Sequence, residues 1–193
     1  MESEWHLSDK IAAITTIAAL LQFIALIFTL FVMVRNGRRQ LRAYVFPNDA
    51  CIYEGTMLEP PIMVHKNKPG VLLNFRNCGQ TPAYNVVSWA DLEIAEPLNE
   101  EKLVAPKLEQ KFPASLGANS VMSKTIWYRR SLTENEISDI NNGAKAIYLF
   151  GRIEYQDAFK KKRATNFRLR YNGPFPPPKG VIFLHCEKGN DAN

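Results

Sequence analysis

The sequence has 193 residues, of which 46% are hydrophobic and 22% charged, and its formal net charge is +5. Four arginines within residues 35–42 supply much of that charge, so the rest of the chain lacks the general basic character of a nucleic-acid-binding protein. Three cysteines, Cys51, Cys78 and Cys186, stand at unrelated spacings, which argues against a disulfide framework and fits a reducing compartment.

One apolar segment dominates the chain. From Ile11 to Val34 there is no charged residue, no proline and no glycine, and a helix of this length spans the roughly 30 Å hydrocarbon core of a bilayer. A secretory signal fits less well, because its apolar region covers only about 7–15 residues and precedes a small-residue cleavage site. A long buried helix is the other alternative, although this apolar run exceeds typical globular helices. We predict a transmembrane helix over residues 11–34.

The flanking charges predict its orientation. Residues 1–10 contain three acidic residues and one lysine, whereas residues 35–42 form a basic juxtamembrane segment. Under the positive-inside rule the short N-terminus lies outside and the C-terminal domain lies in the cytoplasm. The inverted orientation is the alternative. The four arginines that we expect to face lipid headgroups are Arg35, Arg38, Arg39 and Arg42.

Small and polar side chains form one stripe along the predicted span. Residues seven positions apart lie on the same side of a helix, and such a stripe lets a second helix approach closely and satisfy a buried amide. The alternative is a monomeric helix whose polar side chains bond to their own backbone. The stripe that we predict to mediate association consists of Thr15, Ala18, Gln22, Ala25 and Thr29.

After the span, period-two alternation of apolar residues predicts β-strands. We expect strands at residues 71–76, 84–94, 121–128, 146–155 and 164–171, a first strand ending before Pro47, and an edge strand at 181–186. In residues 164–171 one face is apolar and the other, with Arg168, is expected to be wet. The connection at 77–83 has turn residues, among them Gly79, which can adopt a positive φ. Residues 96–117 lack a sustained period, and 156–163 form a long hairpin loop.

One short helix has clear local signals. Thr133 and Glu136 form a capping box, Leu132 and Ile137 are placed for a hydrophobic staple, and Gly143 follows as a helix-ending residue. Residues 174–180 are proline-rich and must be extended. We expect a β-sandwich domain over residues 43–173, followed by a proline-rich extension and tail over 174–193 whose last residues, 187–193, are frayed.

Short antiparallel strands at roughly regular spacing suggest a mainly β fold: an immunoglobulin-like antiparallel β-sandwich with one short helix, after one N-terminal transmembrane helix. The motifs RAYV at 42–45, NCGQTPAYNV at 77–86 and FGRIEYQD at 150–157 appear in that order behind the anchor. In this the chain resembles a loose group of uncharacterised bacterial single-pass inner-membrane proteins. It departs from them with Cys78, where an aliphatic residue is usual, and with Lys160, where glycine is common. The resemblance implies a fold and a location, and no chemistry.

No motif points to a metal, a cofactor or a reaction. His65, His185 and the cysteines lack ligand spacing, and there is no nucleophile elbow, phosphate-cradling loop or dinucleotide fingerprint. We therefore expect neither catalysis nor a bound cofactor. One basic run is a candidate contact with anionic lipid, with a solvated hairpin tip as the alternative; nucleic acid is disfavoured because no aromatic residues interleave the run. It consists of Lys160, Lys161, Lys162 and Arg163.

These features predict a membrane-anchored cytoplasmic interaction or scaffolding module without catalytic activity. Its expected partners are membrane lipids and a protein or a second copy of the chain bound through the helix. The alternative is a membrane effector or accessory subunit whose helix oligomerises or joins a channel or transporter. An enzyme is a third class, and it requires a cleft with converging polar groups.

Overall fold

The computed structural model describes residues 7–55, 65–106 and 114–193. Its first element, α1 (Leu7–Leu41), is an α-helix of 35 residues, and in the described part of the chain it is the one helix long and apolar enough to cross a membrane. Arg38 and Arg39 lie in its last turn, where they complement the helix dipole. The basic segment after the predicted span is thus mostly helical. Most of the N-terminus predicted at 1–10 and part of the irregular stretch at 96–117 lie outside the described residues.

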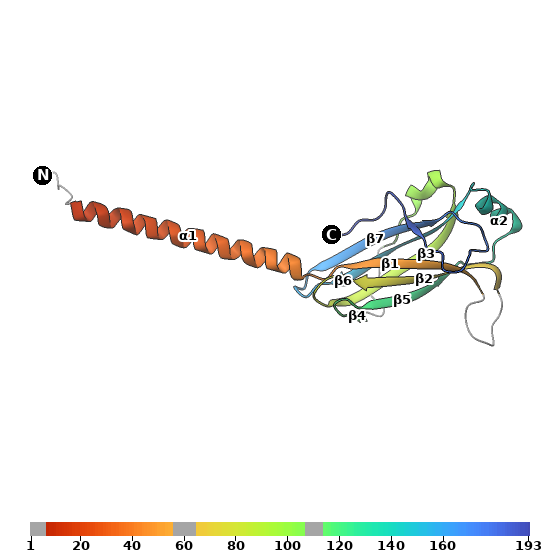
Figure 1. Ribbon diagram of the computed structural model, residues 1–193, viewed down its shortest axis with the longest axis horizontal. Helices are drawn as coiled ribbons and strands as arrows, with labels where there is room; N and C mark the ends of the chain where they lie inside the picture. The colour runs from red at the N-terminus through yellow and green to blue at the C-terminus, as the bar shows by residue number, and fades with distance from the viewer. Residues whose placement is uncertain (1–6, 56–64, 107–113) are drawn as a thin grey trace. The chain divides into compact units, whose positions relative to one another are not determined.

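Residues Arg42–Asn193 form a compact unit of their own. Figure 1 shows two antiparallel sheets layered face to face. The first sheet has the order β1-β2-β5, and the second has the order β4-β3-β6-β7-β8. The strands are β1 (Val45–Gly55), β2 (His65–Asn77), β3 (Ala83–Ala95), β4 (Ala114–Leu116), β5 (Val121–Trp127), β6 (Ala146–Gln156), β7 (Lys162–Tyr171) and β8 (Leu184–His185), with a 3₁₀ turn, η1 (Pro97–Lys102), after β3.

This strand pairing has the arrangement of an immunoglobulin-like sandwich. The first, second and fifth strands form one sheet, the third, sixth and seventh form the other, and the short fourth strand lies beside the third. The predicted fold class is therefore confirmed: the chain is mainly β, with one long apolar N-terminal helix and one short α-helix, α2 (Glu134–Asn141).

The core lies between the two sheets and follows the predicted alternation. Val71, Leu73 and Phe75 of β2 are fully buried, and the ring of Phe75 meets that of Phe167 from β7 with centroids 6.0 Å apart. Each such side chain contributes about 1.5–3 kcal/mol of hydrophobic free energy. The opposite sheet supplies Leu92, Ile147, Leu149, Ile153, Phe167, Leu169 and Tyr171 to the same core.

The first strand was predicted to end before Pro47, and this was wrong. Strand β1 continues through Pro47 to Gly55. Proline is tolerated here because β1 is the outermost strand of its sheet and because its ladder with β2 shifts register between Pro47 and Asp49. Proline therefore marks an irregularity of the edge strand rather than its end.

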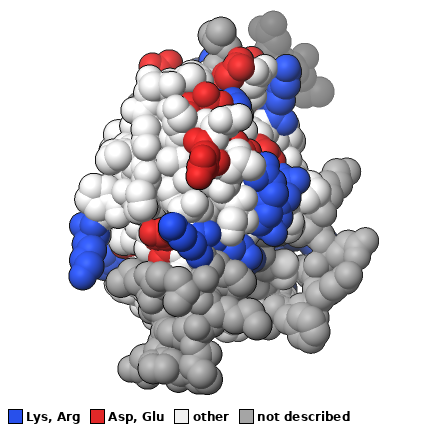
Figure 2. All heavy atoms as spheres, turned by 90° about the vertical axis from the view of Figure 1, so that its right-hand side faces the viewer, with Lys and Arg blue, Asp and Glu red and all other residues white. Residues whose placement is uncertain are grey.

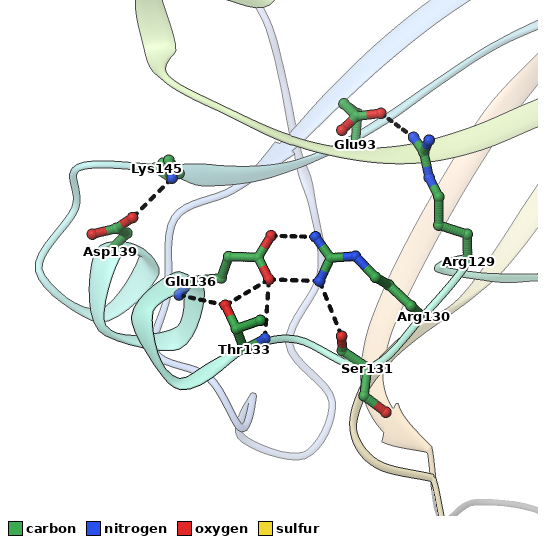
Figure 3. A network of polar contacts seen from close by, with 8 residues as sticks. All are labelled: Glu93, Arg129, Arg130, Ser131, Thr133, Glu136, Asp139 and Lys145. Atoms are coloured by element: carbon green, nitrogen blue, oxygen red, sulfur yellow. Dashed lines mark hydrogen bonds and ion pairs between the residues drawn. The ribbon is translucent and has the colours of Figure 1, made fainter.

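The capping box of α2 is confirmed. The Thr133 hydroxyl accepts a hydrogen bond from the backbone N–H of Glu136 at 3.3 Å, and the Glu136 carboxylate accepts one from the backbone N–H of Thr133 at 3.0 Å. Figure 3 shows that Arg130 adds two further bonds to this carboxylate, while Arg129 pairs with Glu93. These bonds hold the pKa of Glu136 at about 2.

The C-terminal residues complete both sheets. The prediction that residues 187–193 are frayed is therefore wrong. Ile182 forms a bridge with Cys51 of β1, and Leu184 then pairs with Arg170 of β7. Farther on, the carbonyl oxygen of Asp191 accepts a hydrogen bond from the backbone N–H of Asn166 at 2.8 Å. The tail is ordered because these groups occupy the open backbone donors and acceptors of two edge strands.

Candidate functional site at the Ala43 end of the sandwich

The chain passes from α1 into the sandwich over three residues, Arg42, Ala43 and Tyr44, which lie between Leu41 and the start of β1. Ala43 is 1% exposed and Val45 is fully buried. We call the end of the sandwich where Ala43 lies the Ala43 end. Because the chain is buried from Ala43 onward, the sandwich begins almost directly after the helix.

Asn77 holds this passage and was not identified from the sequence. Its side-chain oxygen accepts hydrogen bonds from the backbone N–H groups of Tyr44 at 3.1 Å and Gly79 at 3.0 Å. Its amide nitrogen donates to the carbonyls of Thr81 at 2.8 Å and Gly117 at 3.0 Å. A fully buried amide with this many partners joins the 77–82 turn to the first residues of the sandwich.

Gly79 serves close approach rather than a positive φ, since the glycines with positive φ in the described chain lie elsewhere. A Cβ atom at this position would come within 2.3 Å of the Arg42 carbonyl oxygen and 2.6 Å of the Ala43 Cα. The predicted reason for this glycine was therefore wrong. The turn needs it because the backbone of residues 42–44 passes directly over it.

The second sheet contacts the same passage. The Tyr155 hydroxyl accepts a hydrogen bond from the Val45 N–H and donates one to the Ala43 carbonyl, both at 3.3 Å. The Thr165 hydroxyl donates to the Val45 carbonyl at 2.8 Å. Burial raises the pKa of Tyr155, so its hydroxyl stays protonated and able to donate. The end of β6 and the start of β7 thus lie near Ala43. The hairpin that joins these two strands belongs to the same end of the sandwich.

That hairpin is built on a buried carboxylate. Asp157 is 1% exposed, and one of its oxygens accepts hydrogen bonds from the backbone N–H groups of Phe159 and Lys161, both at 2.9 Å. The other oxygen accepts from Arg163 Nε at 3.0 Å. Lys160 takes a φ of 62°, a backbone conformation that favours glycine. The loop is shorter than expected, because β7 already begins at Lys162.

The structure separates the predicted basic residues into engaged and exposed groups. Arg163 is paired with Asp157, and the guanidinium of Arg42 lies 4.2 Å from the centre of the Tyr44 ring. Three hairpin side chains are exposed and have no ion-pair partner among the described residues; these are Lys160, Lys161 and Lys162. Arg35, Arg38 and Arg39 belong to α1 and are exposed.

The opposite end of the sandwich carries a different charge pattern. Figure 2 views the α2 end, where acidic and basic side chains lie beside one another. Among them are the ion pairs Arg130–Glu136 and Lys145–Asp139. A run of three consecutive exposed lysines therefore distinguishes the Ala43 end.

A polar groove of about 510 Å³ lies beside the hairpin. Arg152 and Glu154 in its lining form an ion pair of 2.6 Å, and Lys162 and Asn193 also line it. In the described part of the chain no three metal-ligating side chains converge. The groove offers paired charges and amides, which suit a polar contact surface.

Residues 11–173 match a family model described as a domain of unknown function, DUF8453. The chain belongs to this family. No curated protein and no solved structure matches it. The DUF8453 match includes both α1 and the sandwich through β7, and therefore Asn77, Asp157 and the three exposed lysines. The tail over 174–193 lies beyond it.

The predicted association stripe lies in the DUF8453 helix, and its residues are exposed in the single chain. The Thr15 hydroxyl donates to the Ala12 carbonyl at 2.9 Å, and the Thr29 hydroxyl donates to the Ala25 carbonyl at 2.8 Å. The Gln22 amide has no hydrogen-bond partner among the described residues. Ala18 and Ala25 complete the stripe, so Gln22 is its one member whose side-chain hydrogen-bond donors are unused among the described residues.

Proposed function

We propose that this protein is a single-pass protein of the bacterial inner membrane that displays its β-sandwich in the cytoplasm as an interaction or scaffolding module without catalytic activity. The length and apolar character of α1 support the anchor. The arginine flank and the three cysteines at unrelated spacings support the orientation.

The observation that carries the proposal is the position of Lys160, Lys161 and Lys162. Their hairpin follows Tyr155, which is bonded to Ala43, and Ala43 is two residues beyond the last residue of α1. Because so few residues separate the end of α1 from Ala43, we infer that these lysines reach the lipid headgroups. Each basic residue near an anionic leaflet contributes about 1 kcal/mol of attraction, which favours one face of the sandwich toward lipid and leaves the others for a protein partner.

Lysine footprinting tests the lipid contact. The full chain is placed in nanodiscs of phosphatidylcholine with or without phosphatidylglycerol, and acetylation rates are followed by mass spectrometry. Lys160, Lys161 and Lys162 should react more slowly on the anionic discs, and high salt should remove the difference. Lys66 is the matched control, since it is exposed and lies at the other end of the sandwich. Equal rates on both discs would mean that the hairpin is a solvated tip.

A reporter fused to the C-terminus tests the orientation. A reporter that is active only outside the cytoplasm should be silent, and its activity would contradict the cytoplasmic assignment.

Co-purification from native membranes, followed by protein identification, would then identify the protein that binds the sandwich or the helix.

The second candidate is an effector or accessory subunit whose α1 associates within the bilayer. It is favoured by Gln22, because the hydroxyls of Thr15 and Thr29 are satisfied by their own helix while this amide is not. An unpaired amide in hydrocarbon is costly, and a second helix can supply its partner.

A further inference from the structure

A second cavity, of about 230 Å³, lies on the outer face of β6 and β7. Residues 103–105 and the C-terminal tail enclose it from the sides, since Leu103, Val104 and Gly189 all belong to its lining. One water occupies about 30 Å³ in the liquid, so the space admits a molecule of a few heavy atoms and excludes a nucleotide or a large cofactor.

Arg168 in its lining is held in a fixed place. The residue is 6% exposed, against the prediction of a wet face for β7. Its Nη2 donates to the Leu103 carbonyl at 2.7 Å, and its backbone N–H donates to Asn190 Oδ1 at 2.9 Å. A Cβ atom on Gly189 would lie 2.9 Å from its Cζ, so the tail backbone packs directly on the guanidinium. The residue is buried because both covering segments fold over it.

Among the described residues no carboxylate pairs directly with this buried cation; Glu101 acts on it only at longer range and is itself paired with Lys188. Two other guanidiniums of the same sheet have a direct partner: Arg163 pairs with Asp157, and Arg152 pairs with Glu154. The Nε of Arg168 also has no hydrogen-bond partner. A buried charge without a counter-ion is unfavourable, and a cavity beside it provides room for one.

The lining defines the chemistry of the missing counter-ion. Leu103, Val104 and Phe150 supply apolar surface. Asp191, also in the lining, is bonded to Asn166 and disfavours a multiply charged anion. Because Arg152 is already paired with Glu154, Arg168 is the one guanidinium of the lining without a carboxylate at ion-pair distance among the described residues.

We propose that this cavity binds a small organic monocarboxylate. The carboxylate pairs with the guanidinium of Arg168, a geometry to which arginine is suited, and the short alkyl group contacts the apolar lining. The affinity expected for so small a ligand is on the order of 1 mM. This site is independent of the lipid contact proposed for the hairpin.

Thermal unfolding of the full chain in neutral detergent, with sodium butyrate as the probe, tests the proposal at constant ionic strength. Butyrate at ten times its Kd should raise Tm by about 3 °C. Butyramide, a neutral molecule of the same shape, should not, and inorganic phosphate should act more weakly. Arg168→Gln should lose the response to butyrate. Arg170→Gln, on the same face of β7 but outside the cavity, should keep it.

Three outcomes would overturn the proposal: an unchanged response in Arg168→Gln, an equal shift with butyramide, or a shift with phosphate as large as that with butyrate. Should Arg168→Gln fail to fold, Ala105→Phe provides the test, because it fills the cavity from a half-exposed position without touching the charge. Loss of the butyrate response in that variant supports the site, and an intact response refutes it.

Discussion

Glu136 accepts two hydrogen bonds from the guanidinium of Arg130, at 2.7 and 2.8 Å. The same carboxylate accepts the backbone N–H of Thr133 at 3.0 Å, so one side chain joins the β5–α2 connection to the first turn of the helix. The hydrogen bonds from Arg130 are the main cause of its low pKa, about 2 against an ordinary 4.5.

This pKa predicts a pH dependence. A carboxylate whose pKa is lowered by folding stabilises the fold at pH values above its unfolded pKa. That contribution should be lost as the pH falls from 4.5 toward 2. We expect Glu136→Gln to be less stable than the wild type at pH 7, and the difference in Tm to disappear near pH 2. Parallel Tm curves over this range would contradict the assigned ion pair.

Removal of the N-cap should weaken α2. Thr133→Ala deletes the hydroxyl that accepts the Glu136 N–H, and we expect it to lower the free energy of unfolding by about 0.5–2 kcal/mol. Chemical unfolding of the full chain in detergent provides the measurement. Ser131→Ala is the matched control, since only the backbone carbonyl of Ser131 takes part in the network. If both variants unfold like the wild type, the cap is unimportant for stability.

Asn77→Ala should be among the most damaging single substitutions in the sandwich. It leaves buried backbone groups of Tyr44, Gly79 and Thr81 without their partner. We expect a loss of about 3 kcal/mol or more. Asn77→Asp separates the two halves of the amide: it keeps the acceptor but places an oxygen against the carbonyls of Thr81 and Gly117. It should also be strongly destabilised at neutral pH, and a mild effect of either variant would contradict this role.

Lys160→Gly should stabilise the hairpin. A residue with a side chain at a φ of 62° is strained by about 1 kcal/mol relative to glycine, and we expect a gain of that order in unfolding free energy. Lys161→Gly has the same effect on charge without relieving a positive φ, so it should give no gain. Equal stabilities of the two variants would show that backbone strain at Lys160 is negligible.

Gln22→Leu should reduce association of α1 within the bilayer. Interhelical hydrogen bonds of this kind are worth about 0.6–2 kcal/mol, and leucine inserts more readily, so failed insertion could not explain the loss. In-cell crosslinking of residues 2–42 provides the measurement, with Leu21→Ala as a control outside the stripe. If the wild-type helix, Gln22→Leu and Leu21→Ala all associate equally, or if none of them does, α1 is a simple tether.

The sequence predicted those parts of the fold whose cause is local. Strand β6 and the α2 capping box depend on alternation or on side chains three positions apart. The two-sheet arrangement could be expected for the same reason, since Val71, Leu73 and Phe75 need a second apolar face to cover them.

The candidate sites depend on residues that are far apart in the chain, which local patterns do not report. Asn77 binds the backbone of Tyr44 and Gly117, and Arg168 binds that of Leu103. An alternating strand predicts that Arg168 faces water, and it is buried only because residues 103–105 and the C-terminal tail fold over it. The sequence places Arg163 in the basic run that was predicted to contact lipid. Its ion pair with Asp157 forms only when the hairpin closes, so the sequence pattern does not reveal it.

The closing of both sheets by the C-terminal residues has a consequence for biosynthesis. Ile182 bridges to β1, and the backbone N–H of Asn193 donates to Ala164 of β7 at 3.2 Å. Two edge strands therefore stay open until residues 182–193 have been translated. The sandwich cannot be completed while only β1 through β7 have left the ribosome, so the closing of these two edges is a late step of its folding.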